Sequence, residues 1–209
     1  MDLTQQRALL VQQIAAMDLT LSESQVDQLM TYLGLLLKWN KAYNLTAVRD
    51  ASEMVSRHLV DSLSVLPYVK GPRLIDVGSG PGLPGIPLAI CRPDLQVTTL
   101  DSNGKKTRFQ NQVKVELGLH NLTVINGRAE QQEIEPFDEV ISRAFASMQD
   151  MIKWTEQLCR PAGVFLAMKG IYPEDELAEL PTGIELKNSY RLDVPGTQGA
   201  RHLMVLGRE

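Results

Sequence analysis

Apolar and polar residues follow different patterns in the two parts of this chain. Within residues 22–40, apolar side chains recur every three or four positions, at Val26, Leu29, Met30, Leu33, Leu36 and Leu37. This spacing places them on one stripe of a helix that packs on a core. Ser22 with Gln25 three residues later is a capping box and predicts the start of that helix. With a shorter helix before it and another over residues 52–69, residues 1–70 are predicted to be helical.

From residue 73 the pattern changes to short apolar runs, at 74–77, 97–100, 122–125, 138–142 and 164–168. Most of these runs are separated by helix-like segments, which is typical of a parallel sheet covered on both faces. Residues 184–192 and 201–208 flank a turn-rich segment and predict an antiparallel hairpin. We therefore expect an α/β fold with a mostly parallel seven-stranded sheet that ends in a C-terminal hairpin.

A further helix is predicted over residues 148–159. Ser147 can cap its first turn, and Pro161 and Gly163 are expected to end it. The two cysteines, Cys91 and Cys159, then fall within or at the end of helices. Their spacing suits neither a metal site nor a disulfide framework, which favours a reduced, cytoplasmic setting.

The stretch RLIDVGSGPGLPGIPLAI, residues 73–90, combines a strand, a glycine-rich loop and the start of a helix. Gly78, Gly80 and Gly82 can adopt positive φ and present no Cβ, so a ligand can lie against the backbone. Dinucleotide sites favour G-x-G-x-x-G. Here Asp76 starts a D-x-G-x-G-x-G spacing, which is similar to the S-adenosylmethionine loop of Rossmann-like methyltransferases. A tight turn without a ligand is the other interpretation, and no Gly-Lys-Ser/Thr follows as in a P-loop.

Acidic residues follow the next two strands. Asp101 ends the second run, where a carboxylate can accept hydrogen bonds from both ribose hydroxyls of a nucleotide. It could instead cap the helix that follows, as could Ser102. Ala129 and Glu130 follow the third run and could contact an adenine ring through a backbone N–H and a carboxylate. Alternatively, Glu130 is a solvated loop residue.

Arg143 follows the fourth run, where the methyl acceptor of such an enzyme would lie. An Asn/Asp-Pro-Pro-aromatic element, usual for amine methylation, is missing there. Methylation of a pyrimidine carbon would need a cysteine nucleophile in the site. What remains is an acceptor that is already nucleophilic, such as guanine N7. Arg143 could hold the cofactor carboxylate, a substrate phosphate or guanine, or form a surface salt bridge.

Seven motifs together resemble the bacterial small-subunit rRNA guanine-N7 methyltransferase family, the glucose-inhibited-division-B type. They occur in order between about residues 22 and 206: WNKAYNLTAV (39–48), RHLVDS (57–62), the glycine loop, LDSNGKK (100–106), GRAE (127–130), ISRAF (141–145) and MKG (168–170). The resemblance implies a class I methyltransferase domain over residues 71–209 with a helical extension over residues 1–70. It also implies transfer from S-adenosyl-L-methionine to N7 of one guanine in a 16S rRNA loop near the decoding region.

The resemblance assigns the family's cofactor contacts to five positions: Gly78, Leu83, Ala129, Glu130 and Arg143. The residue pattern adds Gly80 and Asp101, and it identifies no catalytic residue. We expect a monomer without a metal, acting on naked rRNA or on an assembled small subunit. The alternatives are a methyltransferase for another RNA, a small molecule or a protein, a nicotinamide oxidoreductase, and a non-catalytic RNA-binding protein.

Two groups of polar residues precede the glycine loop. Asn40, Asn44 and Thr46 could border the active site or satisfy the turn between helices. His58 and Asp61 are three residues apart on a helix, and we expect a structural hydrogen bond between them.

Composition adds limits to these expectations. Hydrophobic residues make up 44% of the 209 positions and charged residues 22%, as in ordinary globular proteins. No signal peptide and no run of about 18 apolar residues are evident, so no membrane association is expected. The net charge of −4 requires an RNA-binding protein to gather its positive charge locally. We therefore predict one basic face around the cofactor cleft.

Overall fold

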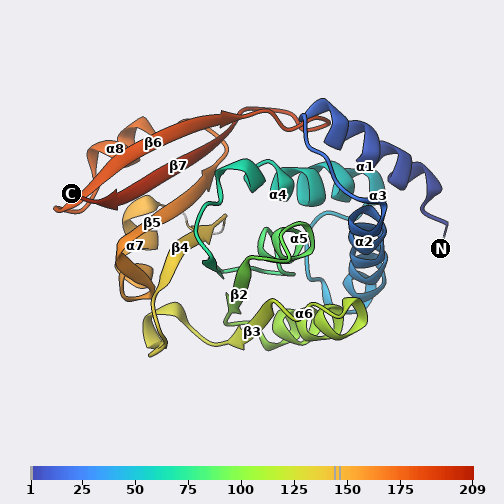
Figure 1. The fold of residues 1–209 in the computed structure, drawn as a ribbon, viewed down its shortest axis with the longest axis horizontal. Coiled ribbons are helices and arrows are strands. Elements are labelled where there is room, and N and C mark those ends of the chain that lie inside the picture. Colours follow the sequence, from blue (N-terminus) through green and yellow to red (C-terminus); the bar gives the residue numbers. More distant parts are fainter. Residues whose placement is uncertain (1, 144, 146) are drawn as a thin grey trace.

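The computed structural model describes residues 2–143, 145 and 147–209, in which seven strands form one twisted sheet (Figure 1). The strand order is β3-β2-β1-β4-β5-β7-β6. The strands are β1 (Arg73–Val77), β2 (Gln96–Asp101), β3 (Leu122–Asn126), β4 (Phe137–Ser142), β5 (Cys159–Lys169), β6 (Ile184–Leu192) and β7 (Arg201–Arg208). Strands β1 to β5 are parallel, whereas β7 runs antiparallel to both β5 and β6. The predicted sheet and hairpin are confirmed.

Helices precede the sheet and alternate with its strands. They are α1 (Thr4–Ala16), α2 (Glu23–Tyr43), α3 (Ala51–Met54), a π-helix (Val55–Val60), α4 (Asp61–Leu63), α5 (Gly85–Cys91), α6 (Gly104–Leu117), α7 (Met148–Thr155) and α8 (Glu174–Ala178). The predicted capping box at the start of α2 is confirmed, because Ser22 and Gln25 exchange hydrogen bonds of 2.9 and 3.2 Å. No helix in the described ranges combines the length and apolar composition that a membrane crossing needs.

The sheet carries a separate apolar cluster on each face, because successive side chains of a strand point in opposite directions. Leu74 of β1 packs in the cluster that also contains the apolar stripe of α2 and the buried residues of α5 and α6. Ile75 and Val77 pack in the second cluster, with α7. Helix α2 also reaches the glycine loop, where the Tyr32 hydroxyl donates to the Pro81 carbonyl at 3.0 Å. Helix α2 therefore supports the loop directly.

The predicted end of the helix after Ser147 was wrong. Ser147 does cap α7, accepting a hydrogen bond from the backbone of Asp150 at 3.1 Å, but α7 ends at Thr155. A short 3₁₀ turn follows, and Cys159 already begins β5. Pro161 lies within this strand, where the pairing with β4 shifts register. An irregularity of this kind tolerates a proline, because no ladder hydrogen bond is required of its missing N–H.

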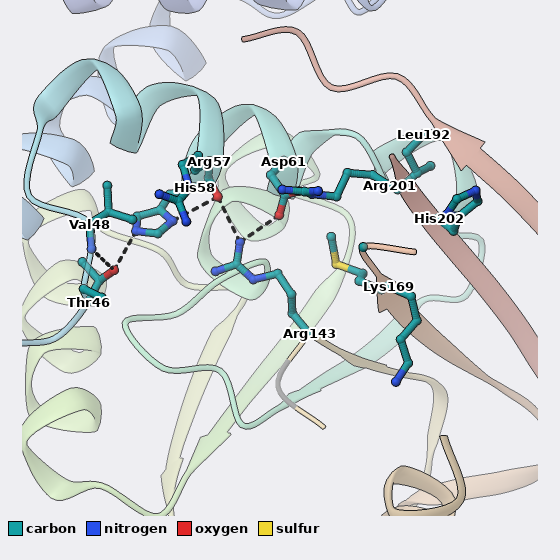
Figure 2. Close-up of a pocket in the computed structure, with 13 residues that line it drawn as sticks. Thr46, Val48, Arg57, His58, Asp61, Arg143, Lys169, Leu192, Arg201 and His202 are labelled. Atoms are coloured by element: carbon teal, nitrogen blue, oxygen red, sulfur yellow. Dashed lines mark hydrogen bonds and ion pairs between the residues drawn. The ribbon is translucent and has the colours of Figure 1, made fainter. Parts of the chain in front are cut away.

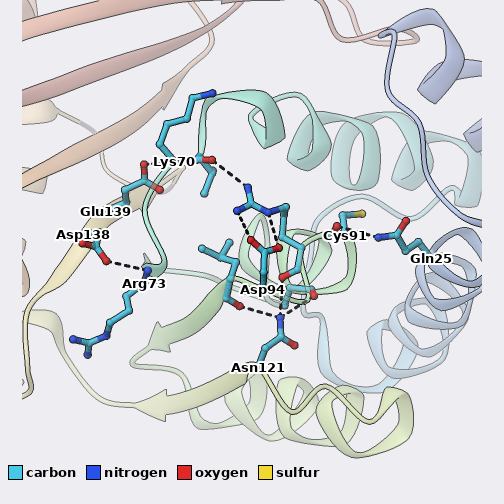
Figure 3. Close-up of polar contacts among 12 residues, drawn as sticks. Gln25, Lys70, Arg73, Cys91, Asp94, Asn121, Asp138 and Glu139 are labelled. Atoms are coloured by element: carbon cyan, nitrogen blue, oxygen red, sulfur yellow. Dashed lines mark hydrogen bonds and ion pairs between the residues drawn. The ribbon is translucent and has the colours of Figure 1, made fainter.

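Polar contacts close the amino-terminal edge of the sheet (Figure 3). Buried Asp138 and Glu139 accept backbone N–H groups of Arg73 and Lys70 at 3.0 and 2.9 Å, which satisfies the segment that enters β1. The Asn121 amide donates at 3.0–3.1 Å to three backbone carbonyls, one in α5 and two in the segment between α5 and β2. The glycine loop lies at the opposite, carboxyl-terminal edge of the strands, where ligands bind in open α/β sheets.

Candidate active site

The glycine loop links β1 to α5 over residues 78–84. Gly78, Gly80 and Gly82 have φ values of 70°, 60° and 97°, a region that favours glycine. A Cβ at position 82 would overlap the Ile86 side chain, so that glycine serves packing. A Cβ at position 80 would meet no heavy atom of the described residues within 4 Å. Gly80 therefore serves backbone conformation and leaves open space beside the loop.

A cavity of about 320 Å³ opens beyond the ends of β1, β2 and β3. It is lined by Val77, Gly78, Leu100, Asp101, Ser102, Gly127, Arg128, Ala129, Glu130, Phe145 and Trp154. The structure thus gathers four of the expected cofactor residues, from three segments, around one space. The Trp154 and Phe145 rings, whose centroids lie 5.6 Å apart, form an apolar wall that sequence reasoning missed.

Asp101 connects this cavity to the glycine loop. The residue is 8% exposed, and its carboxylate accepts hydrogen bonds from the backbone N–H groups of Gly80 and Asn103, each at 2.8 Å. Each oxygen keeps a second lone pair with which it can accept a hydroxyl. The alternative helix-capping roles of Asp101 and Ser102 are contradicted, because the Asn103 side chain caps α6 by accepting from the backbone of Lys105 at 3.0 Å.

Asp76 lies beneath the loop and is fully buried. One carboxylate oxygen accepts the Gly85 N–H at 2.8 Å, and the other has no hydrogen-bond partner among the described residues. Burial raises the pKa of Asp76 from 3.8 to about 7, because an ionised carboxylate loses hydration there. The acid that precedes the first glycine therefore holds the start of α5 and does not line the cavity.

Gly80, Leu83 and Arg143 are not among the residues that line this first cavity. Leu83 as a whole residue is 2% exposed, its side chain packs in the core, and its backbone N–H donates to the Ser79 carbonyl at 2.8 Å. Arg143 instead lines a second cavity of about 450 Å³ (Figure 2). The structure therefore separates these three positions from the four that line the first cavity, namely Gly78, Asp101, Ala129 and Glu130.

The second cavity lies between the helical segment after α2 and the carboxyl ends of β4 and β5. It is lined by Thr46, Ala47, Val48, Arg57, His58, Asp61, Arg143, Met168, Lys169, Gly170, Leu192, Arg201 and His202. Lys169 forms an ion pair with Glu176 at 2.8 Å. Arg201 and His202 were not expected at the site. They reach it because β7 pairs with β5, which places His202 opposite Lys169.

The predicted hydrogen bond between His58 and Asp61 was wrong. The His58 ring bonds to the Thr46 hydroxyl through Nε2 at 2.9 Å and to the Arg57 carbonyl through Nδ1 at 3.0 Å. A carbonyl only accepts, so Nδ1 carries the proton and Nε2 accepts from the hydroxyl. Burial lowers the pKa of His58 to about 4. The ring is therefore neutral at pH 7, with both nitrogens engaged.

Asp61 bonds to arginines in place of His58. Arg143 Nη1 donates to the Asp61 carboxylate at 2.8 Å and to the Arg57 carbonyl at 3.2 Å. The π-helix turns that carbonyl toward the cavity, and π-helical turns occur often at functional sites. The salt-bridge alternative for Arg143 is thus observed, though within a cavity wall rather than on an open surface.

Asn40 is structural. It is 3% exposed, and its amide donates to the Val48 carbonyl at 3.2 Å and accepts from the Thr46 backbone at 2.9 Å. This pair of contacts shapes the turn after α2 and directs Thr46 to the cavity.

The family described as "GidB: rRNA small subunit methyltransferase G" matches residues 25–204. A protein of Pseudomonas syringae pv. syringae (strain B728a), named "Ribosomal RNA small subunit methyltransferase G", is 59% identical over 90% of this chain and 88% of its own length. A protein of the same name from Ectopseudomonas mendocina (strain ymp) is 56% identical over 100% of this chain and 99% of its own.

Solved structures of lower identity share the fold. The O-methyltransferase TomG from Streptomyces achromogenes, in complex with S-adenosylmethionine, matches with a TM-score of 0.60 at 15% identity, covering 100% of this chain and 99% of its own. TrmN from Thermus thermophilus matches with a TM-score of 0.57 at 16% identity, covering 82% of this chain and 52% of its own. The expected class I methyltransferase fold is confirmed. With a family match that spans most of its length, the chain belongs to the GidB family, rRNA small subunit methyltransferase G.

Proposed function

We propose that this protein transfers a methyl group from S-adenosyl-L-methionine to N7 of a guanine in a 16S rRNA loop near the decoding region. The observation that carries the proposal is the family match over residues 25–204, with relatives above 50% identity that are named as small-subunit rRNA methyltransferases. The open glycine loop beside the Asp101 cavity supports it independently.

The first cavity fits the nucleoside part of this cofactor. Gly78 and Gly80 would present backbone to it, and Asp101 would accept hydrogen bonds from the ribose hydroxyls. Ala129 and Glu130 would border the adenine, with the Phe145 and Trp154 rings beside them. Leu83 would contribute backbone and Arg143 a cation for the methionine carboxylate. Gly78, Asp101 and Ala129 with Glu130 come at the ends of β1, β2 and β3, which are neighbours in the sheet, so the proposed contacts run in the same order along the cofactor.

The second cavity suits an acceptor that requires no deprotonation. The bound cofactor supplies an electrophilic methyl group on a sulfonium. Guanine N7 has a free lone pair and no proton to lose, so the protein has to position the base and needs no general base. A neutral His58, with both ring nitrogens hydrogen-bonded, agrees with this requirement. Its role would be to hold Thr46 and the Arg57 carbonyl in the cavity wall.

The test is methylation of a defined substrate. Small ribosomal subunits and naked 16S rRNA from cells that lack this gene are incubated with the protein and labelled S-adenosylmethionine, and the RNA is digested to nucleosides. We expect label in 7-methylguanosine. Label in another nucleoside or in protein would favour a methyltransferase with another substrate. Cofactor and RNA binding without turnover would indicate the non-catalytic alternative.

We also propose a monomer in the cytoplasm of a bacterial cell, without a metal, that acts on rRNA as such or within the small subunit or a precursor. Residues 1–70 would form the helical extension and residues 71–209 the methyltransferase domain. The contact between Tyr32 and the Pro81 carbonyl supports a rigid attachment of this extension to the cofactor loop.

A further inference from the structure

Asp61 bridges two arginines from distant parts of the chain. Its side chain is 7% exposed, and its two oxygens take different partners. One accepts from Arg143 Nη1 at 2.8 Å, and the other accepts from Arg201 Nε at 3.2 Å. Arg143 follows β4, Arg201 begins β7, and Asp61 begins α4 directly after the π-helix. The three side chains meet in the wall of the second cavity (Figure 2).

The bridge leaves guanidinium donors available. Arg143 uses Nη1 for Asp61 and for the Arg57 carbonyl. Arg201 uses Nε for Asp61 and Nη1 for the Ala200 carbonyl at 2.9 Å. Each guanidinium has five N–H donors, so both retain N–H groups beyond the contacts made within the described ranges. Their side chains are 27% and 28% exposed, which keeps these donors accessible from the cavity.

The cavity has an excess of positive charge in a chain of net charge −4. Its lining includes four cationic side chains, those of Arg57, Arg143, Lys169 and Arg201, and among the described residues Asp61 is the one carboxylate in the lining. Arg57 and Lys169 pair with Glu53 and Glu176 outside the lining, at 3.5 and 2.8 Å, so the excess rests on Arg143 and Arg201, which share Asp61. One carboxylate cannot neutralise two guanidinium groups, and without it the two cations would repel each other. The arrangement therefore suits a further anion, and guanidinium groups match the geometry of phosphate.

We propose that Asp61 is a positioning residue that holds Arg201 as the phosphate-binding group for the rRNA strand carrying the acceptor guanine, and directs Arg143 toward the cofactor. This inference rests on the proposed function. It assigns different ligands to the two arginines, because Arg143 lies at the end of β4 beside the cofactor loop, whereas Arg201 lies on the hairpin side of the cavity.

The test compares Asp61→Asn and Arg201→Gln with the wild-type protein. Asp94→Asn is the matched control, because Asp94 also pairs with an arginine, Arg92 at 2.7 Å, but does not line the cavity. Each protein is assayed for its KM and kcat on unmethylated small subunits, its affinity for S-adenosylhomocysteine by calorimetry, and its Tm. A phosphate contact to single-stranded RNA should also contribute about 0.7 to the slope of log KM against log salt.

We expect Arg201→Gln to raise KM for the subunit about 10-fold or more, to lower the salt slope by about 0.7, and to leave cofactor affinity and Tm unchanged. Asp61→Asn should raise KM similarly and also weaken S-adenosylhomocysteine binding. In the double variant the two effects on KM should be less than additive, because Asp61 acts through Arg201. Asp94→Asn should behave as wild type.

Separate results would overturn the inference and the proposed function. A wild-type KM and salt slope in Arg201→Gln would refute the phosphate site, as would fully additive effects on KM. If Asp61→Asn does not fold, the KM and salt slope of Arg201→Gln still test the phosphate site. That variant keeps the ion pair between Asp61 and Arg143. If the wild-type protein forms no 7-methylguanosine at all, the proposed function itself is refuted, and the inference that rests on it is refuted with it.

Discussion

Replacing Asp101 with alanine removes a carboxylate that lines the first cavity and accepts a hydrogen bond from the glycine loop. The two oxygens accept the N–H groups of Gly80 and Asn103, each at 2.8 Å, in a site that is 8% exposed. The same oxygens are the proposed acceptors for the ribose hydroxyls. Asp101→Ala should therefore lower both the stability of the protein and its affinity for the cofactor.

The magnitudes follow from charge-assisted hydrogen bonds. A hydrogen bond to a charged group contributes about 1.5–3 kcal/mol, and alanine leaves the buried Gly80 N–H without its acceptor. We expect the free energy of unfolding to fall by about 2–4 kcal/mol. Loss of the ribose contact should raise the Kd for S-adenosylhomocysteine by about 10- to 100-fold, since 1.4 kcal/mol corresponds to a factor of ten.

Calorimetric titration with S-adenosylhomocysteine and urea unfolding measure the two effects separately. Asn103→Ala is the control, because it removes the cap of α6 two residues away and leaves the Asp101 carboxylate in place. It should cost about 1 kcal/mol of stability with little change in Kd. A folded Asp101→Ala protein with wild-type affinity would refute the assignment, as would an equal loss of affinity in Asn103→Ala.

Three further predictions concern the loop and its supports. Gly82→Ala should lower stability by more than about 1 kcal/mol and weaken cofactor binding, because its φ is 97° and the new Cβ overlaps Ile86; unchanged urea unfolding would contradict this. Asn121→Ala loses three hydrogen bonds at 3.0–3.1 Å and should lower the unfolding free energy by about 1–3 kcal/mol, with an unaltered Kd for S-adenosylhomocysteine as the check. Burial raises the pKa of Asp76 from 3.8 to about 7, so the folded protein retains a proton that the unfolded chain releases. The stability of wild type relative to Asp76→Asn should therefore decline as pH rises from about 4 to about 7; a difference that stays constant in urea unfolding at several pH values would contradict the raised pKa.

Several features could be predicted because their signals are local. The five apolar runs and the predicted hairpin located the seven strands, six of them to within one residue at each end, whereas β5 begins five residues before its run; Ser22 with Gln25 located the start of α2. The helix after Ser147 was extended too far, because Pro161 was interpreted as a helix terminator. In the folded chain it lies at an irregular part of β5, and only the pairing with β4 reveals that irregularity.

The sequence by itself determined the fold class, the glycine loop and four residues of the first cavity. Alternating strands and helices bring the carboxyl ends of parallel strands to one edge of a sheet, so residues that follow successive strands meet there. The second cavity depended on tertiary structure. Asp61, Arg143 and Arg201 come together because a π-helix, the end of β4 and the antiparallel β7 converge on one point. No periodicity along the chain encodes such long-range pairing, which packing between distant segments decides.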